Sequence, residues 1–445
     1  MQRFITLAFS ALLLLSLNAA TPETHYTVIV SLDGFRWDYP DMYKTPNLDR
    51  MAADGVKAVM LPSYPASTFP NHYTLATGLV PDHHGIINNT FWDVKNRRQY
   101  SMGDSATRNN PEYYLGEPIW ITAQKQGVKT GNMYWVGSDI AIKKSHPTYY
   151  RPWNAKPFLT FEQRIDTVLT WLQKPEPERP RLIMLYFEEP DGSGHHNGPC
   201  SLPTGAVVQH MDSLVGVLRK KIEALPFGED INLIVTSDHG MTDISPERVV
   251  NINDYVKPEW CEVIDGRTPT SIFSKPEYRD SICNALKKAA HIRVWKKEEI
   301  PAELHYGSSD RIGDIVVAPE LGWQFTDVAR DTKGAHGYFP QSPDMQVMFR
   351  AIGPDFKKDA SKLEDLQKYL DDEKVLNKLM EIKTSKKKTF KDFIKATQNI
   401  DIDENSIFDI QVKRLHEYKR QLLNILHVIY LYNQIKENPG MDFYP

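Results

Sequence analysis

The sequence predicts an α/β fold, in which a mostly parallel sheet carries helices on both faces and a C-terminal all-helical fragment follows. From Thr27 to about Gly353, short β-branched runs alternate with amphipathic helical stretches, and this alternation is typical of parallel sheets covered by helices. Of the 445 residues, 41% are hydrophobic and 25% are charged, which is ordinary for a globular chain. The formal net charge of −4 argues against a surface devoted to duplex nucleic acid.

The first residues have the composition of an export signal. Met1-Gln2-Arg3 precedes an apolar stretch from Phe4 to Leu17, and small residues follow at Asn18-Ala19-Ala20. This order predicts a secretory signal peptide over residues 1–20 and a secreted or periplasmic protein. The apolar stretch is too short for a stable membrane span. The alternative is an ordinary buried helix.

Three apolar runs predict strands, and an aspartate follows each run. The pairs are Tyr26–Leu32 with Asp33, Leu182–Phe187 with Asp191, and Ile231–Thr236 with Asp238. Because open α/β sheets bind ligands at the carboxyl ends of their strands, we expect the three carboxylates to meet at one edge.

Helices and loops are predicted between these strands. Phe161–Leu172 and Val207–Ala224 have the apolar spacing of amphipathic helices. Two long polar or proline-rich stretches, Pro81–Tyr114 and Ser145–Lys156, predict loops at the strand ends that build a substrate pocket.

The composition changes near Phe356, after which Lys- and Glu-rich segments carry almost no strand signal. Helices are predicted over Leu363–Ile382, Phe390–Thr397 and Ser406–Lys436, the last stopped by Asn438-Pro439-Gly440.

Carboxylates and imidazoles recur in the motifs that follow the strands. The candidate metal ligands are Asp33, Thr68, Asp191, His195, Asp238, His239 and His336. Oxygen and imidazole ligands suit zinc, and this set is large enough for two ions. Taken singly, an aspartate at a strand end is more often a helix cap, and a lone histidine is more often a surface group. The combination of all of them favours a catalytic site with a hydroxyl nucleophile.

The three cysteines, Cys200, Cys261 and Cys283, show no C-x-x-C spacing, so a cysteine zinc site is not expected. One disulfide is possible, and the pair Cys261–Cys283 is the candidate.

The order of motifs L-D-G-F, T-F-P-N-H, E-E-P-D-x-x-G-H, S-D-H-G-M and G-x-H-G-Y resembles the nucleotide pyrophosphatase/phosphodiesterase family of the alkaline phosphatase superfamily, over about residues 25–357. The resemblance implies an alkaline-phosphatase-like fold and zinc-dependent hydrolysis of phosphodiester or pyrophosphate bonds in nucleotide-type substrates. It assigns one zinc to Asp33, Thr68, Asp238 and His239, and the other to Asp191, His195 and His336.

The same resemblance makes Thr68 the nucleophile of a phospho-threonine intermediate and places Asn89 on the phosphate. The Phe69 N–H and the Asn89 side chain would donate to a phosphoryl oxygen. Aromatic loops that contain Tyr134 and Tyr150 would stack a nucleobase, or else pack these loops against the sheet.

Related chemistries fit less well. Sulfatases require Cys or Ser in a C/S-x-P-x-R context, whereas the chain reads Thr68-Phe69-Pro70-Asn71. No arginine stands next to Thr68 to grip a dianionic monoester, which favours diesters.

The segment Phe408–Asn424 resembles glycogen/maltodextrin phosphorylase, and the likeness extends over about residues 360–445. Lys413, Arg414 and Lys419 match residues near that family's substrate phosphate. The pyridoxal phosphate lysine and the Gly-rich segment of that family have no counterpart here, so no pyridoxal phosphate is expected and this phosphorylase-related transferase fragment is predicted to be inactive.

We therefore expect a signal peptide (1–20), a phosphodiesterase domain without its last segment (21–357) and a helical phosphorylase-like fragment (358–445). A gene fusion, a rearrangement or a sequence-assembly error would each explain such a junction. A remaining alternative is a non-catalytic chimera that only binds zinc or nucleotide.

Overall fold

The computed structural model describes residues 25–325, 332–356, 372–403 and 436. The chain divides into two compact units, Met1–Lys358 and Asp359–Pro445, and each is described by itself. The predicted signal peptide lies outside the described residues, as does the predicted helix Ser406–Lys436 apart from Lys436.

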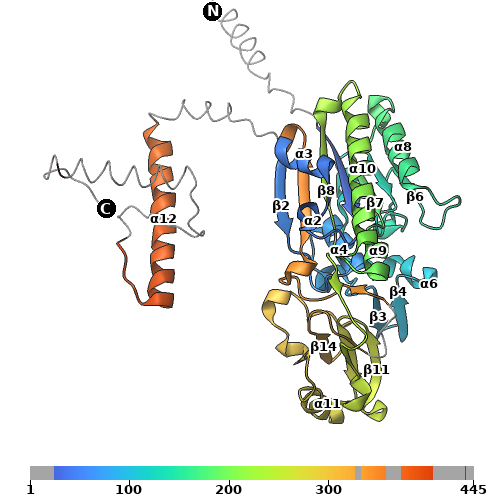
Figure 1. Cartoon of the computed structure of the whole chain (residues 1–445), viewed down its shortest axis with the longest axis vertical. Coiled ribbons are helices and arrows are strands. Elements are labelled where there is room, and N and C mark those ends of the chain that lie inside the picture. Colours follow the sequence, from blue (N-terminus) through green and yellow to red (C-terminus); the bar gives the residue numbers. More distant parts are fainter. Residues whose placement is uncertain (1–24, 326–331, 357–371, 404–435, 437–445) are drawn as a thin grey trace, which may run out of the picture. The chain divides into compact units, whose positions relative to one another are not determined.

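A seven-stranded, mostly parallel sheet forms the centre of the first unit, in the order β2-β17-β8-β1-β7-β5-β6 (Figure 1). Its strands are β1 (Tyr26–Leu32), β2 (Val56–Met60), β5 (Thr130–Met133), β6 (Tyr149–Arg151), β7 (Leu182–Phe187), β8 (Ile231–Thr236) and β17 (Val347–Ile352). β1 runs parallel to β7 and β8, and β5 runs parallel to β6 and β7. Only β17 pairs antiparallel, with β8 on one side and β2 on the other. The predicted fold class is confirmed.

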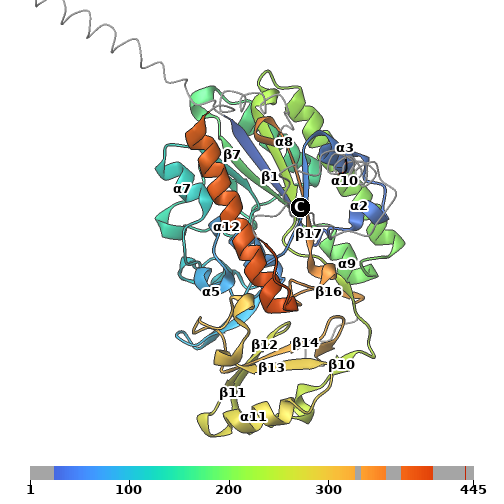
Figure 2. The same ribbon diagram turned by 90° about the vertical axis from the view of Figure 1, so that its left-hand side faces the viewer.

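The three predicted strands have the bounds that the sequence indicates. All six residues of β7 are buried, as expected for a central strand covered on both faces. Helices supply that cover: α3 (Pro46–Asp54), α8 (Phe161–Leu172) and α10 (Leu202–Glu223) lie on one face, and α7 (Ile119–Lys125) lies on the other (Figure 2).

The start of α10 differs from the prediction, which placed it at Val207. The helix begins at Leu202 because the Ser201 side chain accepts a hydrogen bond from the Thr204 N–H, and a proline in the first turn suits a helix start. By contrast, α8 has the predicted bounds, and the Thr160–Gln163 capping box fixes its start.

A second, smaller sheet lies beyond the carboxyl ends of the central strands, at the lower end of the unit in Figure 1. It is antiparallel, in the order β11-β12-β14-β13, and it packs with α11 (Arg279–Leu286) around its own apolar core. Its strands are β11 (Cys261–Gly266), β12 (Thr270–Ser274), β13 (Ile292–Lys296) and β14 (Ile315–Pro319). The sequence did not distinguish this sheet from the central one.

Short elements connect the two sheets and carry the site. The paired strands are β3 (Thr90–Asp93) with β4 (Arg98–Ser101), β9 (Thr242–Asp243) with β16 (Gly334–Ala335), and β10 (Val249–Val250) with β15 (Gln324–Phe325). The short helices are α2 (Tyr39–Met42), α4 (Thr68–Thr77), α5 (Pro81–His84), α6 (Ser105–Arg108) and α9 (Asp191–Asn197). The predicted loop Pro81–Tyr114 thus contains α5, the β3–β4 hairpin and α6, whereas Ser145–Lys156 contributes edge strand β6.

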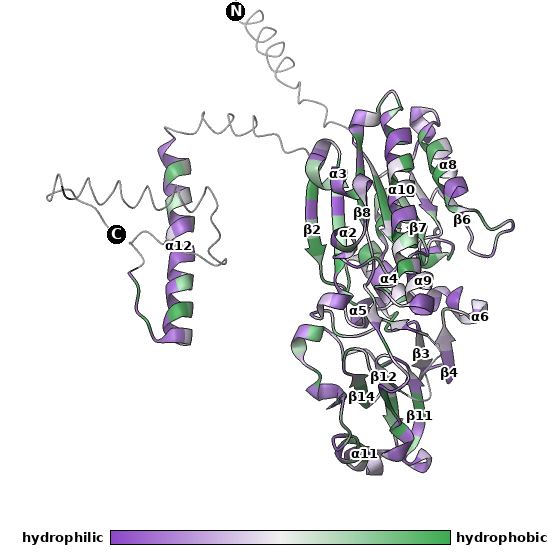
Figure 3. Cartoon of the chain, in the orientation of Figure 1, coloured by the Kyte–Doolittle hydropathy of each residue, from purple (hydrophilic) through white to green (hydrophobic). Residues whose placement is uncertain are grey.

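In the second unit, helices were predicted over Leu363–Ile382 and Phe390–Thr397, and one helix, α12 (Glu373–Gln398), covers most of both. Residues 363–371 of the first prediction lie outside the described residues. The prediction of a break after Ile382 was wrong because the intervening Lys-rich residues contain no Gly or Pro, and lysine is a good helix former. Hydrophilic and hydrophobic residues alternate along α12 (Figure 3). Leu376, Met380 and Phe393 are exposed. Within the described residues, no helix is both long and apolar enough to cross a membrane.

The cysteines do not pair. Cys200 is exposed, Cys261 is partly buried and Cys283 is buried, and all three are free. The candidate disulfide Cys261–Cys283 is therefore absent, with Cys261 on β11 and Cys283 on the buried side of α11.

Candidate active site

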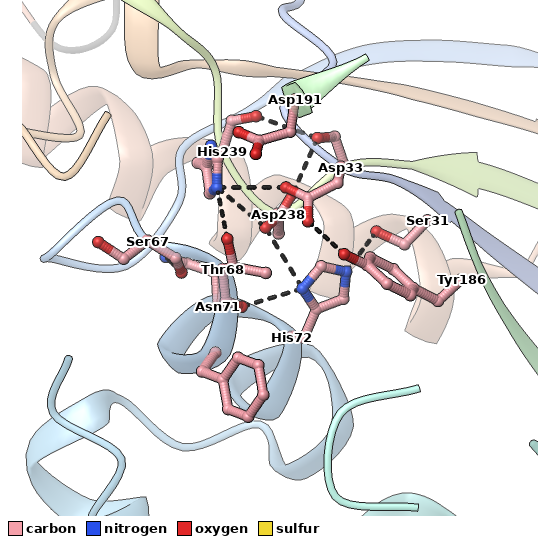
Figure 4. A network of polar contacts seen from close by, with 12 residues as sticks. Ser31, Asp33, Ser67, Thr68, Asn71, His72, Tyr186, Asp191, Asp238 and His239 are labelled. Atoms are coloured by element: carbon pink, nitrogen blue, oxygen red, sulfur yellow. Dashed lines mark hydrogen bonds and ion pairs between the residues drawn. The ribbon is translucent and has the colours of Figure 1, made fainter. Parts of the chain in front are cut away.

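The predicted ligands meet at the carboxyl edge of the central sheet; Asp33, Thr68, Asp191, Asp238 and His239 are shown in Figure 4. Asp33 follows β1, Asp238 follows β8, and Asp191 begins α9 after β7. Thr68 is the first residue of α4, and His336 follows β16. Strands that are adjacent in the sheet thus bring together side chains more than 150 positions apart in the chain.

The first cluster consists of Asp33, Thr68, Asp238 and His239. The Nε2 atom of His239 lies 3.1 Å from the Thr68 Oγ1 atom. The same Nε2 atom lies 3.3 Å from Asp33 Oδ1 and 3.2 Å from Asp238 Oδ2. These are the four side chains that the family resemblance assigns to one ion.

The second cluster consists of Asp191, His195 and His336. The Asp191 Oδ1 atom lies 3.5 Å from His195 Nε2 and 3.8 Å from His336 Nε2. The rings of His336 and His239 stack with centroids 3.7 Å apart, so the two clusters adjoin. Asp191, His239 and His336 also offer ligand atoms within 4.8 Å of one another. His239, a member of the first cluster, therefore also adjoins the second.

All three imidazoles are oriented by backbone carbonyls. The Nδ1–H groups of His195, His239 and His336 donate to Gly334 O at 2.7 Å, Gly240 O at 2.8 Å and Ala66 O at 3.1 Å respectively. These bonds assign the tautomers and turn each Nε2 atom toward the carboxylates. An Nε2 atom that faces a carboxylate oxygen requires a proton or a cation between them, and metal-binding histidines have this arrangement.

Each carboxylate presents an oxygen without a hydrogen-bond donor. Among the described residues, Asp33 Oδ1, Asp191 Oδ1 and Asp238 Oδ2 are buried and have no hydrogen-bond partner. Burying an unpaired charge is costly, and these three oxygens are the ones that face the imidazoles. The chemistry of the donor set therefore fits bound cations.

Burial and neighbouring charges shift the pKa values of three groups in the two clusters. Burial raises the pKa of Asp33 well above its ordinary value, and the nearby Asp238 and Asp191 carboxylates raise it further. Burial also acts to raise the pKa of Asp238, but the imidazoles of His239 and His72 outweigh it and lower that pKa. Burial and the neighbouring imidazoles lower the pKa of His336 well below its ordinary value. A neutral imidazole is the form that binds metal.

Two supporting residues were missed by sequence reasoning. The Tyr186 hydroxyl donates to Asp33 Oδ2 at 2.5 Å. The His72 Nδ1–H donates to Thr68 O at 2.9 Å, and Nδ1 lies 3.3 Å from Asp238 Oδ2. His72 stands one helical turn after Thr68 within T-F-P-N-H, so the motif contained that signal, whereas Tyr186 lies inside the apolar run of β7 and gave none.

Gly34 is required by the close approach of two loops. Its φ is +68°, and a Cβ there would lie 2.9 Å from the Asp191 Cα atom. The Gly34 N–H donates to Asp238 Oδ1 at 3.2 Å, and the Asp191 N–H donates to Asp33 O at 3.0 Å. A side chain at this position would therefore separate the three aspartates.

Two cavities open beside Thr68. The first, of about 540 Å³, is named the aromatic cavity; its aromatic lining is Phe69, Tyr114, Tyr134, Trp135, Trp153 and Tyr186. The second, of about 500 Å³, is named the polar cavity; its lining includes Asn88, Asn89, Arg267, Gln324 and all three members of the second cluster. Thr68, Met102, Gly103 and Asp191 line both.

Three of the four predicted substrate-binding residues line one of the two cavities, and the fourth lines neither. Phe69 and Tyr134 line the aromatic cavity and Asn89 lines the polar cavity. Tyr150 lines neither and stacks on His146, with centroids 4.7 Å apart. Of the two expectations for Tyr150, packing of the loop rather than stacking of a base agrees with this position, because β6 directs Tyr150 away from both cavities. The same loop contributes Trp153, whose N–H donates to Asp139 at 3.0 Å.

Phe69 and Asn89 are paired with each other. The Phe69 N–H donates to Asn89 Oδ1 at 2.9 Å, although both groups were expected to donate outward to a phosphoryl oxygen. This bond leaves the Asn89 amide group, Nδ2, as the donor toward the cavity. It also fixes Asn89 beside Thr68.

A mostly parallel sheet, a hydroxyl residue and two adjoining carboxylate–imidazole clusters define a protein of the α/β class with candidate metal-binding groups at the carboxyl edge of its sheet. The family model described as type I phosphodiesterase / nucleotide pyrophosphatase matches residues 27–339. The chain belongs to this family of hydrolases, which act on phosphodiester bonds.

Curated relatives agree. The chain is 34% identical to human ectonucleotide pyrophosphatase/phosphodiesterase family member 5, over 81% of this chain and 76% of the relative. It is 36% identical to human family member 1, over 78% of this chain but only 39% of the relative. It is 33% identical to the bis(5'-adenosyl)-triphosphatase of Xenopus laevis, over 77% of this chain and 74% of the relative.

Solved structures show the same likeness. Mouse family member 5 matches with a TM-score of 0.70 and 35% identity, over 74% of this chain and 88% of that one. An inactive threonine-to-alanine variant of that mouse protein, in complex with AMP, matches with the same values.

The end of the chain matches a different family. The carbohydrate phosphorylase model covers residues 342–445. The two matched ranges meet between residues 339 and 342, whereas the compact units divide after residue 358. β17 lies between these points and pairs with β8 and β2, so the structure includes it in the phosphodiesterase sheet. Lys413, Arg414 and Lys419 lie outside the described residues.

Proposed function

We propose that the chain is a zinc-dependent hydrolase of phosphodiester or pyrophosphate bonds in nucleotide-type substrates, acting through a phospho-threonine at Thr68. The observation that carries the proposal is the position of the Thr68 hydroxyl. It lies 3.1 Å from the inward-facing His239 Nε2 atom, among buried carboxylate oxygens that have no hydrogen-bond partner in the described part of the chain.

Two ions would be held by the two clusters. Asp33, Thr68, Asp238 and His239 would bind one, and Asp191, His195 and His336 the other. Mixed carboxylate and imidazole ligands suit zinc. When bound, a zinc pair supplies Lewis acidity that lowers the pKa of a hydroxyl and neutralises charge on the attacking and leaving oxygens.

The chain's own residues position the substrate phosphate. Thr68 stands at the start of α4, where the positive end of the helix dipole favours an anion. The Asn89 amide donates to a non-bridging oxygen, whose negative charge grows in the transition state. Thr68 Oγ then loses its proton to solvent and forms a bond to phosphorus while the bond to the leaving oxygen breaks, and the leaving group departs with the electron pair. Attack by water on the phospho-threonine releases the nucleotide and restores the hydroxyl.

The aromatic cavity is the proposed nucleobase site. Tyr134 is held there by Phe158, which stacks on its ring with centroids 4.8 Å apart, and by the Arg164 guanidinium 4.8 Å from the ring centre. Arg164 is in turn fixed by Glu188, with Arg164 Nη2 2.8 Å from Glu188 Oε1. A rigid aromatic wall favours stacking of a flat base. The AMP complex of the mouse relative supports a small nucleotide substrate.

We further propose that residues 1–20 direct the chain to a secreted or periplasmic location, consistent with the "ecto" of its relatives' names. In this proposal the phosphodiesterase domain ends near residue 357 and a phosphorylase-like fragment follows.

Replacement of Thr68 by alanine tests the proposal. Thr68→Ala is expected to lower hydrolysis of bis(p-nitrophenyl) phosphate by at least about 10³-fold, because a nucleophile is lost, while zinc remains bound through the other six ligands. Thr77→Ala, at the far end of the same helix, is the matched control and should keep its activity.

A Thr68→Ala variant with near-normal turnover would exclude Thr68 as the nucleophile. A wild-type chain that binds zinc without hydrolysing any diester would instead favour the non-catalytic alternative.

A further inference from the structure

A buried arginine outside the two metal clusters joins three loops at the carboxyl edge of the central sheet. Arg36 lies in the loop after β1, and its side chain is 6% accessible. Its Nε and Nη2 atoms donate to the two carboxylate oxygens of Asp38 at 2.9 and 2.8 Å. Nη2 also lies 3.0 Å from Asp344 Oδ1, in the loop before β17. Nη1 donates to the backbone oxygen of Met241, in the loop after β8, at 2.7 Å.

The Arg36 guanidinium keeps its charge although it is buried. Burial acts to lower the pKa of Arg36, but the hydrogen bonds and charge of Asp38, together with the charge of Asp344, outweigh it and raise that pKa. A guanidinium presents five N–H donors in a fixed planar fork. One side chain can therefore grip a carboxylate at two points and hold a backbone carbonyl at the same time, which a lysine ammonium cannot do.

These contacts reach strand β9. Asp344 Oδ2 accepts a hydrogen bond from the Thr242 hydroxyl at 2.6 Å. Thr242 is the first residue of β9, and it directly follows Met241. Arg36 thus holds two successive residues, Met241 through its backbone oxygen and Thr242 through Asp344.

Strand β9 in turn positions the strand that carries the second cluster. Thr242 pairs with Ala335 of β16, and His336 follows directly. The backbone oxygen of Gly334, also on β16, orients His195 by accepting its Nδ1–H at 2.7 Å. Both imidazoles of the second cluster are therefore attached to β16, and β16 is attached to β9.

The Met241 side chain supports β16 and α9 together. Met241 is fully buried. A Cβ atom on Gly334 would lie 3.1 Å from the Met241 Sδ atom, and a Cβ atom on Gly194 would lie 3.2 Å from the Met241 Cε atom. Because Gly194 immediately precedes His195 in α9, a shift of Met241 would displace the supports of both imidazoles.

The first cluster is supported by other contacts. Asp33 accepts a hydrogen bond from the Tyr186 hydroxyl. Asp238 accepts one from the Gly34 N–H and lies 3.3 Å from the His72 Nδ1 atom. None of these contacts involves the Arg36 side chain, so removal of that side chain should affect the two clusters unequally.

We infer that Arg36 is a positioning residue for the second cluster, although it follows Asp33 of the first cluster in the chain. Its side chain fixes β9, β9 fixes β16, and β16 sets the places of His195 and His336. This inference rests on the proposed function, in which the second cluster binds the second zinc. Loss of the Arg36 side chain weakens that zinc and leaves the zinc of the first cluster nearly unchanged.

Binding of zinc alone to the metal-free full-length chain, measured by calorimetry, tests the inference. His336→Ala removes a ligand of the second cluster and so identifies which of the two binding steps belongs to it. In Arg36→Gln that step is expected to weaken by about 10- to 100-fold, as for loss of an outer partner of a metal ligand, and the other step to change by less than about threefold. Arg36→Lys should recover part of the loss.

Hydrolysis of bis(p-nitrophenyl) phosphate supplies a second readout. In this nitrophenyl ester assay, kcat/KM of Arg36→Gln should be low at limiting free zinc and should rise toward the wild-type value as zinc is added. Zinc dependence of this kind separates an empty second cluster from a general loss of folded protein, which would lower the active fraction at every zinc concentration.

Arg219→Gln is the matched control. Arg219, on α10, is also largely buried, with a side chain that is 13% accessible, and it contacts Asp54 and Glu223 at 2.6 Å each. Its replacement should lower the Tm and change neither zinc affinity. Asp344→Ala is a milder second variant, because the Asp344 side chain is 29% accessible, and it should weaken the second zinc by about 10-fold.

Equal losses at both binding steps, or no loss at the second step, would overturn the inference and leave the proposed function intact. The same criterion applies to Asp344→Ala if Arg36→Gln does not fold. An equal loss of the second zinc in Arg219→Gln would overturn it too. A wild type that binds fewer than two zinc ions, or that binds two and hydrolyses no diester, would refute the proposed function itself.

Discussion

The Tyr186 hydroxyl provides a sharp test of how the first cluster is supported. Tyr186→Phe removes one oxygen atom and preserves the ring, which packs edge-on against His72 with centroids 4.9 Å apart. The hydroxyl donates to Asp33 Oδ2 at 2.5 Å, in a fully buried setting. The other Asp33 oxygen has no donor in the described part of the chain. The substitution therefore removes the Tyr186 hydrogen bond from the Asp33 carboxylate and preserves the packing of the ring.

The expected magnitude follows from this bond. A hydrogen bond to a charged group contributes about 1.5–3 kcal/mol, and loss of an outer partner of a metal ligand weakens metal binding by about 10- to 100-fold. The Tyr186 hydrogen bond lowers the pKa of Asp33 against the larger effect of burial. Its loss raises that pKa further, so protons compete better with the metal and the pH midpoint for zinc binding rises.

The assay is a zinc competition titration against a chromogenic chelator at several pH values, together with kcat/KM at saturating zinc. Tyr100→Phe is the matched control, because its buried hydroxyl is paired with the Tyr114 hydroxyl at 3.0 Å and does not contact the clusters. If Tyr186→Phe bound zinc as tightly as Tyr100→Phe, with the same pH midpoint, Asp33 would not depend on this bond and the reasoning would be refuted.

Two further predictions concern metal removal and the C-terminal unit. The pKa of Asp33 is raised in the fold without metal, so its contribution to stability is present at low pH and is lost as pH rises through the folded pKa. The lowered pKa of His336 acts in the opposite direction only up to the ordinary pKa of histidine. Above that pH, the Tm of chelated protein should therefore fall more steeply than that of the zinc-loaded protein, and equal slopes in calorimetry would contradict this. A chain that ends at Lys358 should keep kcat/KM within about twofold, as is usual for changes away from a site. The reasons are that every described residue of the two cavities precedes residue 339 and that Leu376, Met380 and Phe393 on α12 are exposed. A larger loss in the nitrophenyl ester assay would show that the second unit supports the site.

The sequence was informative where burial dictates residue type. β1, β7 and β8 appear as apolar runs because both of their faces are covered, so their bounds and the aspartates after them could be read directly. The start of α10 was less clear, because a single capping serine and a proline determine it rather than apolar spacing.

The parts of the site that sequence missed depend on tertiary contacts. Tyr186 is one residue among the apolar side chains of β7, and only its contact with Asp33 distinguishes it. Trp153 and Tyr150 are both aromatic residues of one loop, and the path of the chain after β6 decides which of them lines the cavity. Arg267 lines the polar cavity because the β11–β12 hairpin contacts Asn88, which lies about 180 residues earlier in the chain.

The most direct test of the account is detection of the covalent intermediate. In a rapid acid quench of a single turnover of ATP, the wild-type chain should show a nucleotidyl group on the peptide that contains Thr68, by mass spectrometry, and Thr68→Ala should show none. Full turnover with no adduct on Thr68, together with inversion of configuration at a chiral phosphorus, would contradict the central claim that Thr68 is the nucleophile.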